Sequence, residues 1–132
     1  MDAEQFWQIV ADAQGSAPQL QQILLNSTKA EIIAFDELLD EAMYLLDRKD
    51  IHAITGGSDD GFEYVRLWMV SQGREHVEAV LQDPAKAPGQ EAEEGNEAFG
   101  YAARKAYEEK WGEEMPFRQS KRGSCTNREG WL

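Results

Sequence analysis

The chain has 132 residues, with 25 acidic and 13 basic side chains and a net charge of −12. Hydrophobic residues make up 42% of the chain, which supplies one packed core and is unlike the composition of a disordered protein. The negative charge argues against direct binding to nucleic acid or to an anionic membrane surface, because both depend on clustered lysine and arginine. We expect a soluble cytoplasmic protein, since no apolar run reaches the roughly 20 residues of a spanning helix and no signal peptide begins the chain.

The first 48 residues predict three helices. The first begins at residue 2 and stops at Gly15, a shorter one covers about residues 16–26, and the longest covers residues 28–47. Thr28 and Glu31 form a capping box, in which each of two residues bonds the backbone N–H of the other at a helix start. Behind it, apolar side chains recur at helical spacing for about five turns.

A helix from Asp60 to Gly73 is predicted to be the central one. Apolar side chains occupy nearly every side of it between Phe62 and Val70, and a helix that is apolar all round is buried all round. A short helical segment precedes it over residues 50–55. Further helices are expected over residues 75–81 and 99–111, with a solvated loop between them over residues 85–95.

No internal repeat and no strand pattern is present, so the predicted fold class is all-α. We expect a single compact helical bundle of six to seven helices over residues 1–116 and a polar, flexible C-terminal tail over residues 117–132. Residues 1–116 contain 24 acids and 9 bases, a charge of −15, whereas the tail contains four bases and one acid, a charge of +3.

The long predicted helix carries four acids in two pairs, each pair spaced four residues apart: Asp36, Glu37, Asp40 and Glu41. Like charges at this spacing are neighbours on a helix and cost a few tenths of a kcal/mol each. No base in the same helix offsets them before Arg48. The acids therefore form a solvated face, bind a cationic partner, or pair with a base from another helix; the candidates are Arg66, Arg74 and Arg104.

Asp59, Asp60, Arg66 and Trp68 mark a second candidate site. Asp59 and Asp60 are expected to cap the central helix, where their charge would repel a phosphate. Arg66 is expected to pair with Glu63 or with a carboxylate of the long helix, because an unpaired buried charge is costly. With Trp68, these residues are the candidate lining of a small-molecule pocket.

Metal, cofactor and nucleophile chemistry find little support. His52 and His76 are 24 residues apart and belong to no metal-binding motif. Cys125 is the single cysteine, so it forms neither an intramolecular disulfide nor a thiolate cluster, and we interpret it as a bystander thiol. No cofactor and no metal ion is predicted.

Residues 56–64, Gly-Gly-Ser-Asp-Asp-Gly-Phe-Glu-Tyr, followed by Trp68 and by Ser-Gln-Gly-Arg at residues 71–74, resemble the hallmark of the bacterial domain-of-unknown-function family 4240. The resemblance covers residues 1–116, with residues 58–62 as its most specific part. It implies a small helical bacterial domain and brings no activity, cofactor or catalytic residue. The basic stretch from Arg118 to Arg128 departs from the family pattern, of which Gly130–Leu132 is a shortened echo.

The leading functional hypothesis is a non-enzymatic protein whose acidic surface (Asp36, Glu37, Asp40 and Glu41) binds a basic macromolecular partner. Its most concrete form is a toxin-neutralising immunity protein, since charge steers association with a cationic toxin. The first alternative is an enzyme or small-molecule-binding protein with a pocket at Asp59, Asp60, Arg66 and Trp68. The second is a folded carrier that presents the tail, with Cys125 and Trp131, as the functional peptide. No oligomeric state is predicted.

Overall fold

The computed structural model describes residues 1–89, 92 and 94–132, and among these seven segments are α-helical and none is a strand. The α-helices are α1 (Ala3–Ala13), α2 (Ala17–Leu24), α3 (Lys29–Leu46), α4 (Lys49–Thr55), α5 (Asp59–Ser71), α6 (Arg74–Gln82) and α7 (Ala102–Trp111). Short 3-10 turns are η1 (Pro84–Lys86), η3 (Glu97–Tyr101) and η4 (Arg128–Trp131). The all-α prediction is confirmed. No helix in the described ranges combines the length and the apolar character needed to cross a lipid bilayer.

The helices begin where local side-chain chemistry places them. In the predicted capping box of α3, Glu31 donates its backbone N–H to Thr28 Oγ1 at 3.2 Å and accepts the backbone N–H of Thr28 at 2.9 Å. The backbone hydrogen bond from Thr28 lowers the pKa of the Glu31 carboxyl below its usual value. Asp2 and Gln5 form the same arrangement at the start of α1. These bonds satisfy backbone donors that a helix start leaves without an internal partner.

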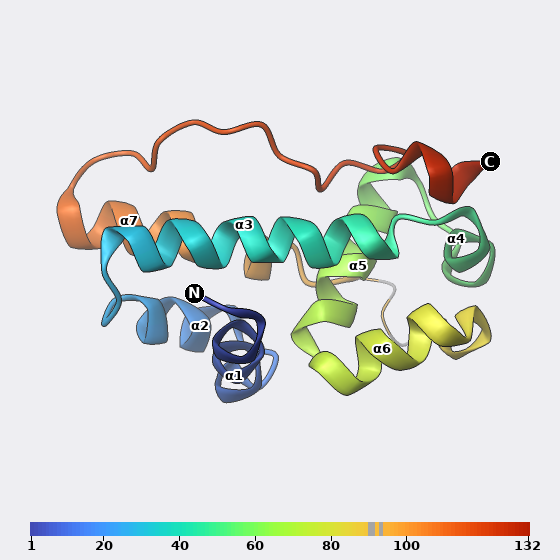
Figure 1. Cartoon of the computed structure of the whole chain (residues 1–132), viewed down its shortest axis with the longest axis horizontal. Helices are drawn as coiled ribbons and strands as arrows, with labels where there is room; N and C mark the ends of the chain where they lie inside the picture. Colours follow the sequence, from blue (N-terminus) through green and yellow to red (C-terminus); the bar gives the residue numbers. More distant parts are fainter. Residues whose placement is uncertain (90–91, 93) are drawn as a thin grey trace.

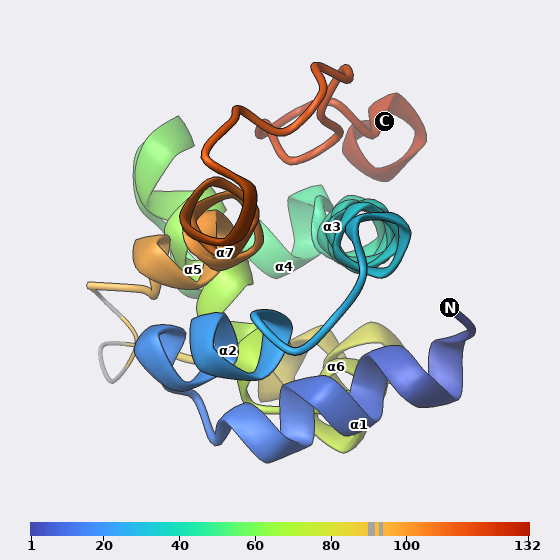
Figure 2. The ribbon, with the colours of Figure 1, turned by 90° about the vertical axis from the view of Figure 1, so that its left-hand side faces the viewer.

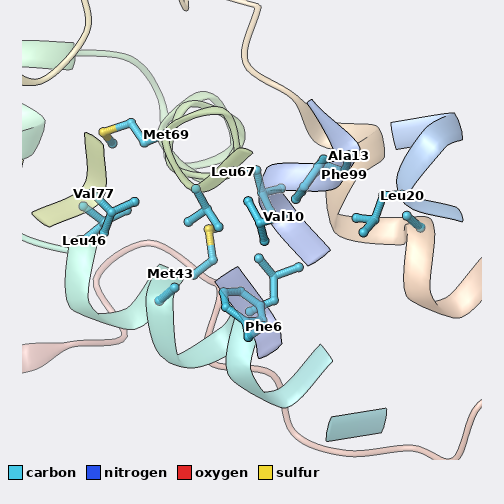
Figure 3. Close-up of a cluster of buried hydrophobic side chains, with 14 of the residues drawn as sticks. Phe6, Val10, Ala13, Leu20, Met43, Leu46, Leu67, Met69, Val77 and Phe99 are labelled. Carbon is cyan, nitrogen blue, oxygen red and sulfur yellow. The ribbon is translucent and has the colours of Figure 1, made fainter. Parts of the chain in front are cut away.

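Helix α5 is the central element of the bundle, as its all-round apolar pattern predicts. It contacts α1, α3, α4, α6 and η3, and seven of its 13 residues are buried. Figure 3 shows its side chains Leu67 and Met69 in a cluster with Met43 and Leu46 of α3 and with Phe6 and Val10 of α1. The core of the protein is therefore assembled around α5 from helices that are distant in sequence.

The predicted solvated loop over residues 85–95 is wrong in part. Ala87, Pro88 and Ala92 are buried, and η1 overlaps the start of the segment. Gly95 lies so close to α5 that a Cβ atom there would stand 2.5 Å from the backbone of Tyr64, and it has a φ of 67°. Small side chains let this polar segment pack against the core, a role that its composition does not reveal. Residues 90, 91 and 93 of the predicted loop lie outside the described residues.

The C-terminal segment, residues 117–132, lies along α3. Figure 1 shows it running above α3 in the same N-to-C direction, from the end of α7 to the vicinity of α4, and Figure 2 shows it end-on above α3 and α7. None of residues 111–132 is buried. The prediction of a loose tail is corrected to that of a strap held on the outer face of the bundle.

The core position of α5 generates a stability prediction with a matched control. Leu67 is 2% exposed and Leu45 of α3 is 52% exposed. Leu67→Ala is expected to lower the free energy of unfolding by about 2–5 kcal/mol, because it removes buried contacts and leaves a cavity. Leu45→Ala should change it by less than about 0.5 kcal/mol. Denaturant unfolding followed by circular dichroism measures both, and equal effects would contradict the central placement of α5.

Candidate functional site

Two carboxylates of α3 form the centre of the site. Asp36 and Asp40 lie one helical turn apart, and each side chain is only 5% exposed. Two buried acids at this spacing repel each other and lose hydration, so each needs a charged partner to remain ionised inside the fold. The partners come from the C-terminal segment.

Arg118 and Arg122 each bridge the two carboxylates. Arg118 donates from Nη1 to Asp36 Oδ2 at 2.6 Å and from Nη2 to Asp40 Oδ2 at 2.8 Å. Arg122 donates from Nη2 to Asp36 Oδ1 and from Nε to Asp40 Oδ1, and it also donates to the Gly100 carbonyl at 2.6 Å. All four carboxylate oxygens thus accept from a guanidinium group. The result is a neutral cluster of two acids and two bases across the face of α3.

The electrostatics of Arg122 reflect this arrangement. Burial by itself lowers the pKa of the guanidinium, but the neighbouring Asp36 and Asp40 carboxylates outweigh burial and raise the pKa above its ordinary value. Planar, permanently charged guanidinium groups suit this geometry better than lysine, because one arginine reaches both carboxylates at once.

Asp47, the C-cap residue directly after α3, forms a second anchor. It is fully buried and accepts the backbone N–H groups of Cys125 at 2.9 Å and Asn127 at 2.8 Å, together with Trp131 Nε1 at 2.8 Å. Gly130 lies against it, where a Cβ atom would come within 2.7 Å of the Asp47 carbonyl oxygen. One carboxylate therefore fixes three residues of the C-terminal segment. Asp36, Asp40 and Asp47 are called the α3 carboxylate site below.

An aromatic contact closes the same end of the segment. The Trp131 ring lies with its centre 5.4 Å from that of His52 in α4 and 6.0 Å from that of Phe62 in α5. The indole thus combines an apolar face against the bundle with its N–H on Asp47. Trp131 is held at the junction of α3, α4 and α5.

Arg66 of α5 binds the backbone of the C-terminal segment. It is fully buried and donates to the carbonyls of Met43 at 3.1 Å and Arg122 at 2.8 Å, and to Ser124 Oγ at 3.1 Å. The expected ion pair with Glu63 or an acid of α3 is therefore wrong. Burial lowers the pKa of Arg66, and Asp47 and Glu63 oppose this from a greater distance. Two carbonyl oxygens and one hydroxyl oxygen satisfy three of its N–H donors in place of a direct carboxylate.

The expectation of an unneutralised acidic face on α3 is corrected at three of its four residues. Asp36 and Asp40 are buried in ion pairs, Glu41 pairs with Lys121 at 2.8 Å, and Glu37 is exposed. The neutralising bases do not come from Arg66, Arg74 or Arg104 but from the segment that was expected to be free. A signal was present in the sequence, since Arg118 and Arg122 are four residues apart, the same spacing as Asp36 and Asp40.

The four residues of the second candidate site lie in different surroundings in the described part of the chain. Asp59 and Asp60 are exposed in the first turn of α5, Arg66 lies beneath the C-terminal segment, and Trp68 packs against His76 with the ring centres 5.7 Å apart. A cavity of about 280 Å³ lies nearby, but it is lined by residues 54–57, Gly61, Val65 and Gly89 and by none of these four. Asp59 instead contacts the C-terminal segment, where its carbonyl accepts from Ser124 Oγ at 2.7 Å.

A larger cavity of about 510 Å³ lies beneath the start of the C-terminal segment. It is lined by Arg104 and Glu108 of α7 and by residues 114–120. Within the described part of the chain, no group of three or more histidine, cysteine, aspartate or glutamate side chains is placed to hold a metal ion. The most highly organised polar chemistry is therefore the contact between the C-terminal segment and the α3 carboxylate site.

Removing the Asp47 acceptor should release one end of the C-terminal segment. In Asp47→Ala, we expect hydrogen exchange at the Cys125 and Asn127 amides to accelerate at least about tenfold, since a hydrogen bond to a charged group contributes about 1.5–3 kcal/mol. NMR measures the exchange rates of these two amides. Glu37→Ala, which removes an exposed acid of the same helix, is the control and should leave both amides unchanged. Unchanged exchange in Asp47→Ala would contradict the anchoring role.

Glu63 generates a prediction about pH. Burial raises the pKa of this carboxyl above its ordinary value, although Arg66 and Arg122 act in the opposite direction. Because the pKa of Glu63 is higher in the folded than in the unfolded protein, ionising this carboxyl lowers the free energy of unfolding. This loss is present at neutral pH and disappears when the pH falls below the pKa of the unfolded chain. Glu63→Gln should therefore raise Tm at pH 7 and match the parent below about pH 4, near the ordinary glutamate pKa. Calorimetry at both pH values tests this; a lower Tm at pH 7 would reverse the sign.

Comparison with known proteins agrees with the sequence resemblance. The family model described as "Protein of unknown function (DUF4240)" matches residues 1–109, whereas no curated protein and no solved structure matches the chain. The matched region contains Asp36, Asp40, Asp47 and Arg66, and it ends before Arg118. The chain belongs to this family of proteins of unknown function, DUF4240.

Proposed function

We propose that this protein is a non-enzymatic binding protein that takes up an arginine-bearing segment of a basic protein partner at the α3 carboxylate site. The observation that carries the proposal is the pair Asp36 and Asp40, whose four oxygens are all directed to guanidinium groups. Charge-assisted, bidentate contacts of this kind are among the stronger polar interactions in proteins and are specific for arginine.

The charge of the whole chain supports a cationic partner. Residues 1–116 contain 24 acids and 9 bases, and the protein keeps a net charge of −12 with the C-terminal segment included. Such a field accelerates encounter with a basic protein and repels acidic ones. A toxin-neutralising immunity protein is the most concrete member of this class, and the charge is the feature that supports it.

The test uses two variants of the whole chain that share the same C-terminal segment without its two bridging arginines. Arg118→Gln/Arg122→Gln keeps the α3 carboxylates and removes their internal partners, and a second protein adds Asp36→Asn/Asp40→Asn to these changes. The probe is a labelled 16-residue peptide with the sequence of residues 117–132, and its matched control has Gln at the two arginine positions.

The arginine peptide should bind the first variant at least about tenfold more tightly than it binds the second, since charged hydrogen bonds contribute about 1.5–3 kcal/mol each. Fluorescence anisotropy measures the affinities, and binding should weaken between 50 and 500 mM salt, values on the order of those that screen exposed charges. Equal affinity for both proteins, or for both peptides, would rule out this site as the seat of the function.

A further inference from the structure

We infer that residues 118–131 are an internal occupant of the α3 carboxylate site, which a partner must displace by presenting a segment of the same pattern. This inference rests on the proposed function and adds the form of the ligand and the control of access to it. The expected partner segment is not α-helical and carries two arginines four residues apart, followed nine residues after the second by a tryptophan. That is the spacing of Arg118, Arg122 and Trp131.

The contacts follow one register along the helix. Arg118 and Arg122 lie at Asp36 and Asp40, Asn127 Nδ2 donates to the Tyr44 carbonyl at 3.1 Å, and Trp131 reaches Asp47. The arginine pair lies at Asp36 and Asp40, and the later residues Cys125 to Trp131 lie at Tyr44 and Asp47, so the segment and α3 run in the same direction (Figure 1). The site thus recognises an ordered series of side chains and not positive charge alone.

The site also forms hydrogen bonds to the backbone of its occupant. Arg66 donates to the Arg122 carbonyl, while Asp47 accepts the amides of Cys125 and Asn127. A helical segment would use these backbone groups internally, and lysine could not bridge two carboxylates as arginine does. Partners are therefore limited to arginine-bearing segments with free backbone groups.

The C-terminal segment is placed so that it can leave without unfolding the domain. None of its residues is buried, and its anchors are mainly ion pairs and hydrogen bonds. The stretch before Arg118 spans a cavity of about 510 Å³, and the Phe117 side chain is 96% exposed. Release would return the three carboxylates to water, where hydration replaces the lost partners. Segments with few buried apolar contacts open at low free-energy cost compared with global unfolding.

One position shows that the internal occupant is an imperfect ligand. Cys125 has a φ of 66°, the left-handed conformation that side chains other than glycine adopt with strain. Its amide must keep this geometry to reach Asp47. A partner segment with glycine at that position would bind without this strain and would have an advantage over the chain's own segment.

The experiment compares wild-type protein with full-length Arg118→Gln/Arg122→Gln, using the same arginine peptide as probe. Wild-type protein should bind the peptide at least about tenfold more weakly, because its own segment competes at high effective concentration. A peptide with glycine in place of Cys125 should bind either protein about threefold or more tightly, as strain relief predicts. Cys125→Gly in the wild-type chain should weaken peptide binding further, because it strengthens the internal occupant.

Hydrogen exchange on wild-type protein provides a second measurement that does not require a destabilised variant. Saturating arginine peptide should accelerate exchange at the chain's own Cys125 and Asn127 amides, which Asp47 holds, while leaving the α5 amides unchanged. The peptide with Gln at both arginine positions is the control.

The outcomes separate the two proposals. If Arg118→Gln/Arg122→Gln binds the peptide through Asp36 and Asp40 but wild-type protein binds it equally well, the internal occupant does not control access, and the proposed function stands. If saturating peptide leaves exchange in the C-terminal segment of wild-type protein unchanged, the displacement inference is overturned. If no variant binds the arginine peptide, the proposed function fails and the inference fails with it.

Discussion

The structure depends on the bridging of Asp36 and Asp40 by Arg118 and Arg122. Neither acid could remain ionised at 5% exposure on one helix face without it, because burying two like charges costs several kcal/mol for each ion. The two acids repel each other within α3, and the arginines that neutralise them also hold the C-terminal segment on the helix. A charge arrangement that is unfavourable in the isolated helix is thus a source of tertiary specificity.

Asp47 and Arg66 extend this contact into a continuous polar network over the bundle. Asp47 accepts backbone amides and the Trp131 indole N–H, and Arg66 of α5 donates to the Arg122 carbonyl of the same segment. Networks of this kind favour one geometry, because removing one member leaves a buried polar group without a hydrogen-bond partner. The apolar core around α5 supplies stability, while the polar network decides where residues 117–132 lie.

The boundary of the family match divides this network into two parts. The acids and Arg66 fall within residues 1–109, and their partners fall beyond them. The matched region thus supplies the carboxylates, and the chain beyond it supplies the arginines that contact them. This division connects the proposed partner chemistry to the proposed displacement, since both follow from the same set of contacts.

The sequence by itself determined the helices, because capping boxes such as Thr28 with Glu31 and the apolar periodicity of α5 act over a few residues. It also determined the excess of negative charge and the family. It did not determine what neutralises Asp36 and Asp40, because their partners lie about 80 positions away and come from a segment without helical periodicity. The burial of Ala87 and Ala92, and the placement of Arg66 beneath the C-terminal segment while Asp59 and Asp60 are exposed, were likewise decided by tertiary structure. Local propensity depends on near neighbours, whereas long-range ion pairs and packing depend on which surfaces the folded chain brings together.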